Sequence, residues 1–204
     1  MKRRNDLVAG PRDKAVQAIK EDRKADAMMH VSELYEDFRP IHDRYVESIN
    51  SLLTFISKRL GEEAVEEAAR CYVEQTATSI FSRMKAMNHE QLVGTLVNLH
   101  RKHYSDFYVE ENDDRTIITI SGCNVGARLL QAGIAQREGG LTSRGWDWSF
   151  NRAGVPYYCV HAHIFNELFK KLELPVEVQW GKQYDDEGNP TGETCRYIIQ
   201  KTAS

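Results

Sequence analysis

A run of apolar residues spaced alternately by three and four positions constrains the fold of this chain more than any other sequence feature. Between Val31 and Leu60 the run comprises Leu34, Phe38, Ile41, Tyr45, Ile49, Leu52, Leu53 and Ile56. Because residues at this spacing share one side of a helix, the sequence predicts a long helix with one buried stripe. Pro40 is the place for a bend, and Gly61 is expected to end the helix.

Two further helices are expected before residue 105. Glu62 and Glu63 suit the start of the next helix, because carboxylates are favoured at the positive end of a helix dipole. Asn88 is a suitable N-cap for a shorter helix from His89 to about His103. The first 104 residues are therefore predicted to form a helical region.

The pattern changes at Ser105. Residues 106–111 and 116–121 alternate or run apolar around a polar turn, which predicts a β-hairpin. A helix at about 161–172 and a second hairpin, from 176–184 to 194–201, follow. The expected fold is α+β, with the helical N-terminal half packed on a small antiparallel sheet of two hairpins and a crossover helix between them. Residues 1–104 and 105–204 would then be two regions of one integrated domain.

Composition excludes several classes of function. A net charge of −3 and a pI near 6.2 give no electrostatic footprint for nucleic acid. No stretch approaches the ~18 apolar residues that a membrane span requires. The charged N-terminus has no apolar segment behind it, as a signal peptide would, so a cytoplasmic protein with reduced cysteines is expected. The mixed charges of Met1–Lys24 fit a solvated helix that could pack in a homodimer.

The densest group of reactive side chains is Cys159-Val160-His161-Ala162-His163. A thiol beside two imidazoles forms either a nucleophile with its general base or part of a metal shell. If a helix begins near Val160, His163 lies one turn from Cys159 and His161 points elsewhere on the helix. If the segment is still extended there, Cys159, His161 and His163 share one face.

Two more cysteines lie at the ends of predicted strands. Cys123 follows a strand and precedes a short helix, where backbone N–H groups would lower the pKa of the thiol and hold a developing oxyanion. Cys195 lies on the last strand and becomes relevant only if it faces Cys123 or Cys159. Cys71, on an N-terminal helix, is expected in the core.

A metal site is the alternative to a nucleophile. The chain has no CxxC pair and no HExxH motif, so this interpretation depends on the number and softness of the ligands. Cys123, Cys159 and Cys195 with His161 would suit a tetrahedral structural zinc, whereas two thiols and an imidazole would leave an open catalytic position. Zinc and iron are the ions considered.

The glycine-rich segment from Gly122 to Gly154 is predicted to be a functional or mobile loop. Its tryptophans would wall an apolar pocket or simply cover the sheet, and its arginines would pair with a substrate carboxylate. The candidate substrate-binding residues are Arg144, Trp146, Trp148, Arg152 and Tyr158. The sequence leaves open whether residues 139–154 form a lid.

The C-terminal half resembles a known family. The residues that carry the resemblance are Tyr158-Cys159, the helix after them, Pro175-Val176-Glu177-Val178, Gly188 and Cys195-Arg196-Tyr197-Ile198-Ile199. They are similar to the C-terminal part of the L-2-amino-thiazoline-4-carboxylic acid hydrolase-like family, and Gly61–Arg70 is similar to its helical lead-in. The same tail resembles the 4-vinyl-reductase-type domain, a small-ligand-binding α+β module with cysteines proposed to hold metal. The resemblance implies hydrolytic opening of a C–N bond in a small cyclic substrate, with the family's cysteine pattern falling on Cys123, Cys159 and Cys195.

The leading hypothesis is therefore a small-molecule hydrolase. Cys159 or Cys123 would be the nucleophile or a metal ligand, His161 or His163 the base, and Cys195 would complete the shell. The alternatives are a non-enzymatic metal- or small-ligand-binding module, and a structural protein with inert cysteines.

Overall fold

The computed structural model describes residues 9–201 and divides the chain into two compact units, one ending at Tyr45 and one beginning at Val46. Within the first unit, α2 (Pro11–Lys20) is joined by a short turn to α3 (Lys24–Leu60), whose last residues belong to the second unit. The part of the predicted N-terminal charged segment before residue 9 lies outside the described residues.

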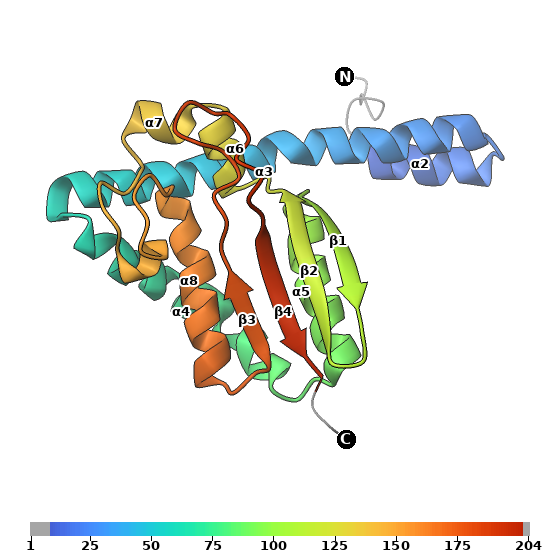
Figure 1. Ribbon diagram of the computed structural model, residues 1–204. Coiled ribbons are helices and arrows are strands. Elements are labelled where there is room, and N and C mark those ends of the chain that lie inside the picture. Colours follow the sequence, from blue (N-terminus) through green and yellow to red (C-terminus); the bar gives the residue numbers. More distant parts are fainter. Residues whose placement is uncertain (1–8, 202–204) are drawn as a thin grey trace. The chain divides into compact units, whose positions relative to one another are not determined.

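The second unit is a four-stranded antiparallel sheet with helices (Figure 1). Its elements are α4 (Glu63–Met84), α5 (His89–Lys102), β1 (Asp106–Glu111), β2 (Arg115–Gly122), α6 (Gly126–Gln131), α7 (Ile134–Glu138), α8 (Val160–Lys171), β3 (Val176–Gln179) and β4 (Cys195–Gln200), with 3-10 turns at Asp147–Ser149 and Tyr157–Cys159. The strand order is β1-β2-β4-β3. The predicted α+β class, with two antiparallel strand pairs and a helix between them in the sequence, is confirmed.

Local sequence signals account for where several elements begin and end. The Asn88 side chain accepts the backbone N–H of Gln91 at 2.9 Å, and the Gln91 side chain accepts the Asn88 N–H at 3.0 Å. This capping box fixes the start of α5. Gly61 adopts a φ of 95°, which favours glycine, and so ends α3. In the β1–β2 turn, Asn112 Oδ1 accepts the N–H groups of Asp114 and Arg115.

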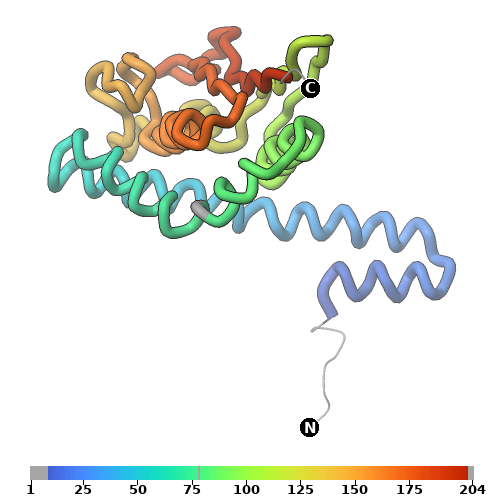
Figure 2. Tube along the Cα trace, turned by 90° about the horizontal axis from the view of Figure 1, so that it is seen from below, coloured from blue at the N-terminus to red at the C-terminus, as the bar shows by residue number. Residues whose placement is uncertain are grey.

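The core of the second unit lies between one face of the sheet and its helices. Figure 2 shows α5 and α8 beside each other on that face, with α4 beyond α8. Ile118 and Ile120 of β2 belong to the same core cluster as Ile164 and Phe169 of α8, and all four are at most 2% exposed. Each such side chain contributes roughly 1.5–3 kcal/mol by leaving water. The packed layer holds the ends of β2, α8 and β4 in fixed positions.

The stripe of α3 that the sequence predicts to be buried is mostly exposed. Leu34, Phe38, Ile41, Tyr45 and Leu52 are each 40–61% exposed, whereas Leu53 is buried and Ile49 and Ile56 are half-buried. Apolar spacing shows which residues share a side of a helix, but not whether the same chain covers that side. The prediction of burial is therefore wrong for most of the stripe.

Among residues 9–201, the helices lack an apolar stretch long enough to cross a membrane.

Candidate functional site

Three cysteines from distant parts of the sequence interact in the second unit. Cys123 lies between β2 and α6, Cys159 ends the turn before α8, and Cys195 begins β4 opposite Ile120 of β2. Ionisation of Cys123 or of Cys195 would raise the pKa of Cys159, so the three thiols lie within electrostatic reach of one another. We call this group the thiol cluster.

Gly126, the first residue of α6, lies close to two members of the thiol cluster, Cys123 and Cys159. The backbone N–H groups of Ala127, Val125 and Gly126 act to lower the pKa of the Cys123 thiol. A Cβ atom at Gly126 would lie only 2.3 Å from Cys159 Sγ. The absence of a side chain at Gly126 is therefore what lets the Cys159 sulfur sit against the backbone beside Cys123.

The segment after β3 supplies further contacts. The Trp180 side chain acts to lower the pKa of Cys159, and Gly181 exchanges hydrogen bonds of 3.5 Å with Cys195 Sγ through its N–H and C=O. The Gln183 side chain accepts the Cys123 N–H at 3.0 Å and donates to Ile120 O at 2.6 Å. Each cysteine is thereby held by a residue of 180–183.

Sequence reasoning missed Trp180, Gly181 and Gln183 because residues 176–184 were expected to be one strand. Strand β3 ends at Gln179, and the following residues cross over to the thiol cluster instead. Trp180 is a large side chain next to a glycine, and this break in the alternating pattern was the available signal.

Burial raises the pKa of every thiol in the cluster. It raises the pKa of Cys123 despite the hydrogen bonds from α6, so the expectation of a lowered pKa at this position is wrong in direction. Burial, and then the charges of Cys123 and Cys195, raise the pKa of Cys159 well above its usual value, and the pKa of Cys195 rises to about 12. All three groups are thiols rather than thiolates at neutral pH.

The spacing of the sulfurs bears on which ligand fits. Of the three described sulfur atoms in the thiol cluster, at least two lie more than 4.8 Å apart. A tetrahedral zinc ion with bonds of about 2.3 Å to each sulfur would bring them closer than that. The donor set suits a thiophilic metal, but at least one side chain must move to bind a single ion.

His161 contacts residues that lie outside the thiol cluster. Helix α8 begins at Val160, which is the first of the two predicted geometries. The Nδ1 atom of His161 lies 2.7 Å from the carbonyl oxygen of Tyr158, and its ring contacts Tyr72, Tyr158 and Phe165. Burial lowers the pKa of His161, so the ring is neutral and packs as an aromatic side chain.

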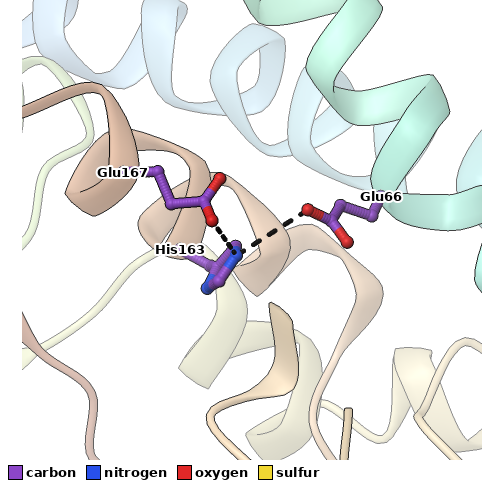
Figure 3. A group of neighbouring side chains, drawn as sticks. All are labelled: Glu66, His163 and Glu167. Atoms are coloured by element: carbon purple, nitrogen blue, oxygen red, sulfur yellow. Dashed lines mark ion pairs between the residues drawn. The ribbon is translucent and has the colours of Figure 1, made fainter. Parts of the chain in front are cut away.

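His163 lies in a polar group between two helices. Figure 3 shows His163 and Glu167 of α8 turned toward Glu66 of α4. His163 Nε2 is 3.3 Å from Glu167 Oε1 and 3.7 Å from Glu66 Oε1. Arg70 Nη2 donates to Glu66 at 2.6 Å and to Glu167 at 2.5 Å. These donor atoms of Glu66, His163 and Glu167 form the set, among the described residues, that lies within 4.8 Å and could hold a metal ion.

Electrostatics favour the ionised form of Glu167 in this second group. Burial opposes ionisation of Glu167, but the hydrogen bond from Arg70 and the charge of His163 outweigh it and lower its pKa. Any cation bound by His163 and the two carboxylates must compete with Arg70. Sequence reasoning missed Glu66 and Glu167. The i,i+4 spacing of His163 and Glu167 could have indicated a pair, whereas Glu66 comes from a helix far away in sequence.

Glu62 anchors the segment 139–154, which carries Trp146 and Trp148, and the Tyr157 that follows it. Its carboxylate accepts the Trp146 indole N–H at 2.5 Å, the Ser143 backbone N–H at 2.8 Å and the Tyr157 hydroxyl at 3.2 Å. Trp148 is 2% exposed and belongs to the main core. Trp148 is therefore a core residue and does not line an open pocket.

The remaining candidate substrate residues have protein partners. The Arg152 guanidinium donates to Glu193 at 2.6 Å, and Arg144 lies 4.0 Å above the Trp146 ring. Tyr158 is buried in a smaller core cluster with Leu129. Cys71, expected in the core, is exposed on α4, where its sulfur accepts from the Gln75 side chain.

Comparison with known proteins gives no relative from which a function could be transferred. No family model, no curated protein and no solved structure matches this chain.

Proposed function

We propose that this protein is a binding module for a thiophilic ligand, first of all a soft metal ion, held by Cys123, Cys159 and Cys195. One observation carries the proposal: three thiols from three separate elements interact in one partly buried place. Cysteines that serve only as small apolar core residues have no reason to lie near one another.

The electrostatics of the thiol cluster support a cationic ligand. Burial and then the charges of Cys123 and Cys195 raise the pKa of Cys159, and burial and then the charge of Cys123 raise that of Cys195, so the cluster does not ionise alone at neutral pH. A soft cation displaces the protons and removes the mutual repulsion, because it binds thiolates and carries the opposite charge. The N–H donors of α6 and Trp180 then stabilise the thiolates.

The same pKa directions weigh against a thiol nucleophile. Catalytic cysteines have lowered pKa values and sit in electropositive surroundings. Here burial raises the pKa of Cys123 and Cys159. His161, one candidate base, hydrogen-bonds instead to the Tyr158 carbonyl.

Metal analysis tests this proposal. The full chain, purified without added metal under reducing conditions, is examined for zinc and iron by plasma mass spectrometry and then titrated with Zn²⁺ against a chromophoric chelator. We expect about one ion per chain, lost in Cys159→Ser and in Cys195→Ser with the circular dichroism unchanged. Cys71→Ser is the matched control, because Cys71 is an exposed cysteine outside the cluster. Absence of bound metal together with absence of Zn²⁺ and Fe²⁺ binding would refute the proposal.

A hydrolase is the second candidate, favoured by the arrangement of Glu66, His163 and Glu167. A divalent ion on these three ligands would keep open positions for water and substrate, or Glu167 would orient His163 as a general base. The test is consumption of 2-amino-thiazoline-4-carboxylate, followed by mass spectrometry. Loss of turnover in His163→Asn but not in His30→Asn, a control in another His–Glu pair, would support it. Absence of turnover in the wild-type chain, with and without added Zn²⁺, would exclude this substrate.

A further inference from the structure

The exposed side of α3 within the first unit has the repeat of a coiled coil. Val31, Leu34, Phe38, Ile41 and Tyr45 follow one another at spacings of three, four, three and four residues. All five are exposed, between 40% and 61%. A strict alternation of three and four averages 3.5 residues, which is the period that keeps one side of a helix against a second helix wound around it. We call these five residues the α3 seam.

The first unit has little core of its own. Among its described residues, the buried apolar side chains are Ala15, Ala18 and Ala27. Alanines bury little apolar area, so the two helices gain little stability from packing on each other. An open hollow of about 520 Å³ lined by Ile19, Met28 and Val31, among others, adjoins the seam. Large apolar side chains in such numbers on one surface indicate an interaction site.

Charged residues beside the α3 seam can pair with opposite charges of a second copy in a two-fold symmetric dimer. Asp37 and Arg44 directly precede Phe38 and Tyr45, so they flank the seam on the same side, and both are exposed. In an antiparallel pair of α3 helices centred near residues 39–40, Asp37 of each copy lies opposite Arg44 of the other. Phe38 then faces Ile41, and Leu34 faces Tyr45. A parallel pair would place Asp37 near His42 instead, which is buried.

We infer that the α3 seam binds a second copy of this chain as an antiparallel two-helix coiled coil. A closed two-fold interface uses the same patch on both partners, and this patch is complementary to itself in both apolar spacing and charge. The inference does not depend on the thiol cluster.

The experiment measures the mass of the full chain in solution. Sedimentation equilibrium of the wild type at micromolar concentration is expected to give twice the chain mass of 23.4 kDa. Ile41→Glu puts a carboxylate into the seam and is expected to give a monomer with unchanged helix content by circular dichroism. Arg39→Gln is the control, because it makes the same change in net charge at an exposed position of α3 outside the seam.

Charge exchange tests the orientation. Asp37→Arg and Arg44→Asp should each weaken the dimer about tenfold or more, and the double variant Asp37→Arg/Arg44→Asp should restore it. A wild-type monomer, or a dimer indifferent to Ile41→Glu, would overturn the inference. A dimer that is lost in Ile41→Glu but not restored by the double charge exchange would overturn the antiparallel arrangement.

Discussion

Gly126→Ala tests the geometry of the thiol cluster directly. The new methyl group would lie 2.3 Å from Cys159 Sγ, far inside the ~3.5–4.0 Å at which such atoms attract. Gly126 does not have a positive φ, so alanine adds no backbone strain. The effect of the substitution is therefore steric and is confined to the cluster.

The expected change in the free energy of unfolding combines two opposing effects. Forcing a methyl group into a filled site costs about 1–3 kcal/mol. Replacing glycine by alanine at a helical position returns at most about 1 kcal/mol. We expect Gly126→Ala to lower the free energy of unfolding by about 1–2 kcal/mol. Removing the sulfur with Cys159→Ala leaves room for the methyl group, so the double variant should be at least about 1 kcal/mol more stable than the sum of the single changes predicts.

The assay is urea unfolding of the four proteins under reducing, metal-free conditions, followed by circular dichroism. Gly94→Ala is the control, because a Cβ at this glycine of α5 meets nothing within 4 Å. That variant should be as stable as the wild type or gain up to about 1 kcal/mol. Additive effects of Gly126→Ala and Cys159→Ala would show that the methyl group and the sulfur do not compete for the same space, and would refute the arrangement described for Gly126.

Two further predictions concern buried and anchoring polar groups. Burial lowers the pKa of His100 to about 4 from 6.5, so as pH falls the unfolded chain takes up the proton first and stability is lost between about pH 6.5 and pH 4. His100→Phe should reduce this loss by about 2 kcal/mol, measured by urea unfolding at pH 7 and pH 4.5, and an unchanged pH dependence would contradict it. Glu62→Ala removes the acceptor of three hydrogen bonds and should cost roughly 1–3 kcal/mol. Trypsin should then cut faster at Arg144 and Arg152, whereas Glu63→Ala, a change at an exposed neighbour, should leave the cleavage rate unchanged.

Those parts of the fold that depend on short-range signals were predictable from the sequence. The cap at Asn88, the stop at Gly61 and the turn that pairs β1 with β2 each depend on a few residues, and the structure has all of them. His100 of α5, in contrast, is buried beside Tyr197 of β4. Its burial depends on which strand pairs with β2, and sequence spacing does not contain that information.

The candidate site was predictable only in part for the same reason. The sequence identifies Cys123, Cys159 and Cys195 as chemically important types at strand and helix ends. Their neighbours depend on tertiary packing: Trp180 and Gly181 reach the cluster because β3 ends early, and His163 meets Glu66 because α4 packs on α8. A pattern along one segment cannot show which distant segment lies opposite.

The separation of the three cysteines along the chain makes occupancy of their site a property of the whole second unit. A ligand bonded to all three ties the end of β2, the start of α8 and the start of β4 to one another, and the unfolded chain offers no comparable arrangement. Such a ligand at a hundredfold excess over its Kd would add about 2.7 kcal/mol to the free energy of unfolding. The melting temperature of the chain should consequently report ligand loading, and a chelator should act on the protein as a mild denaturant.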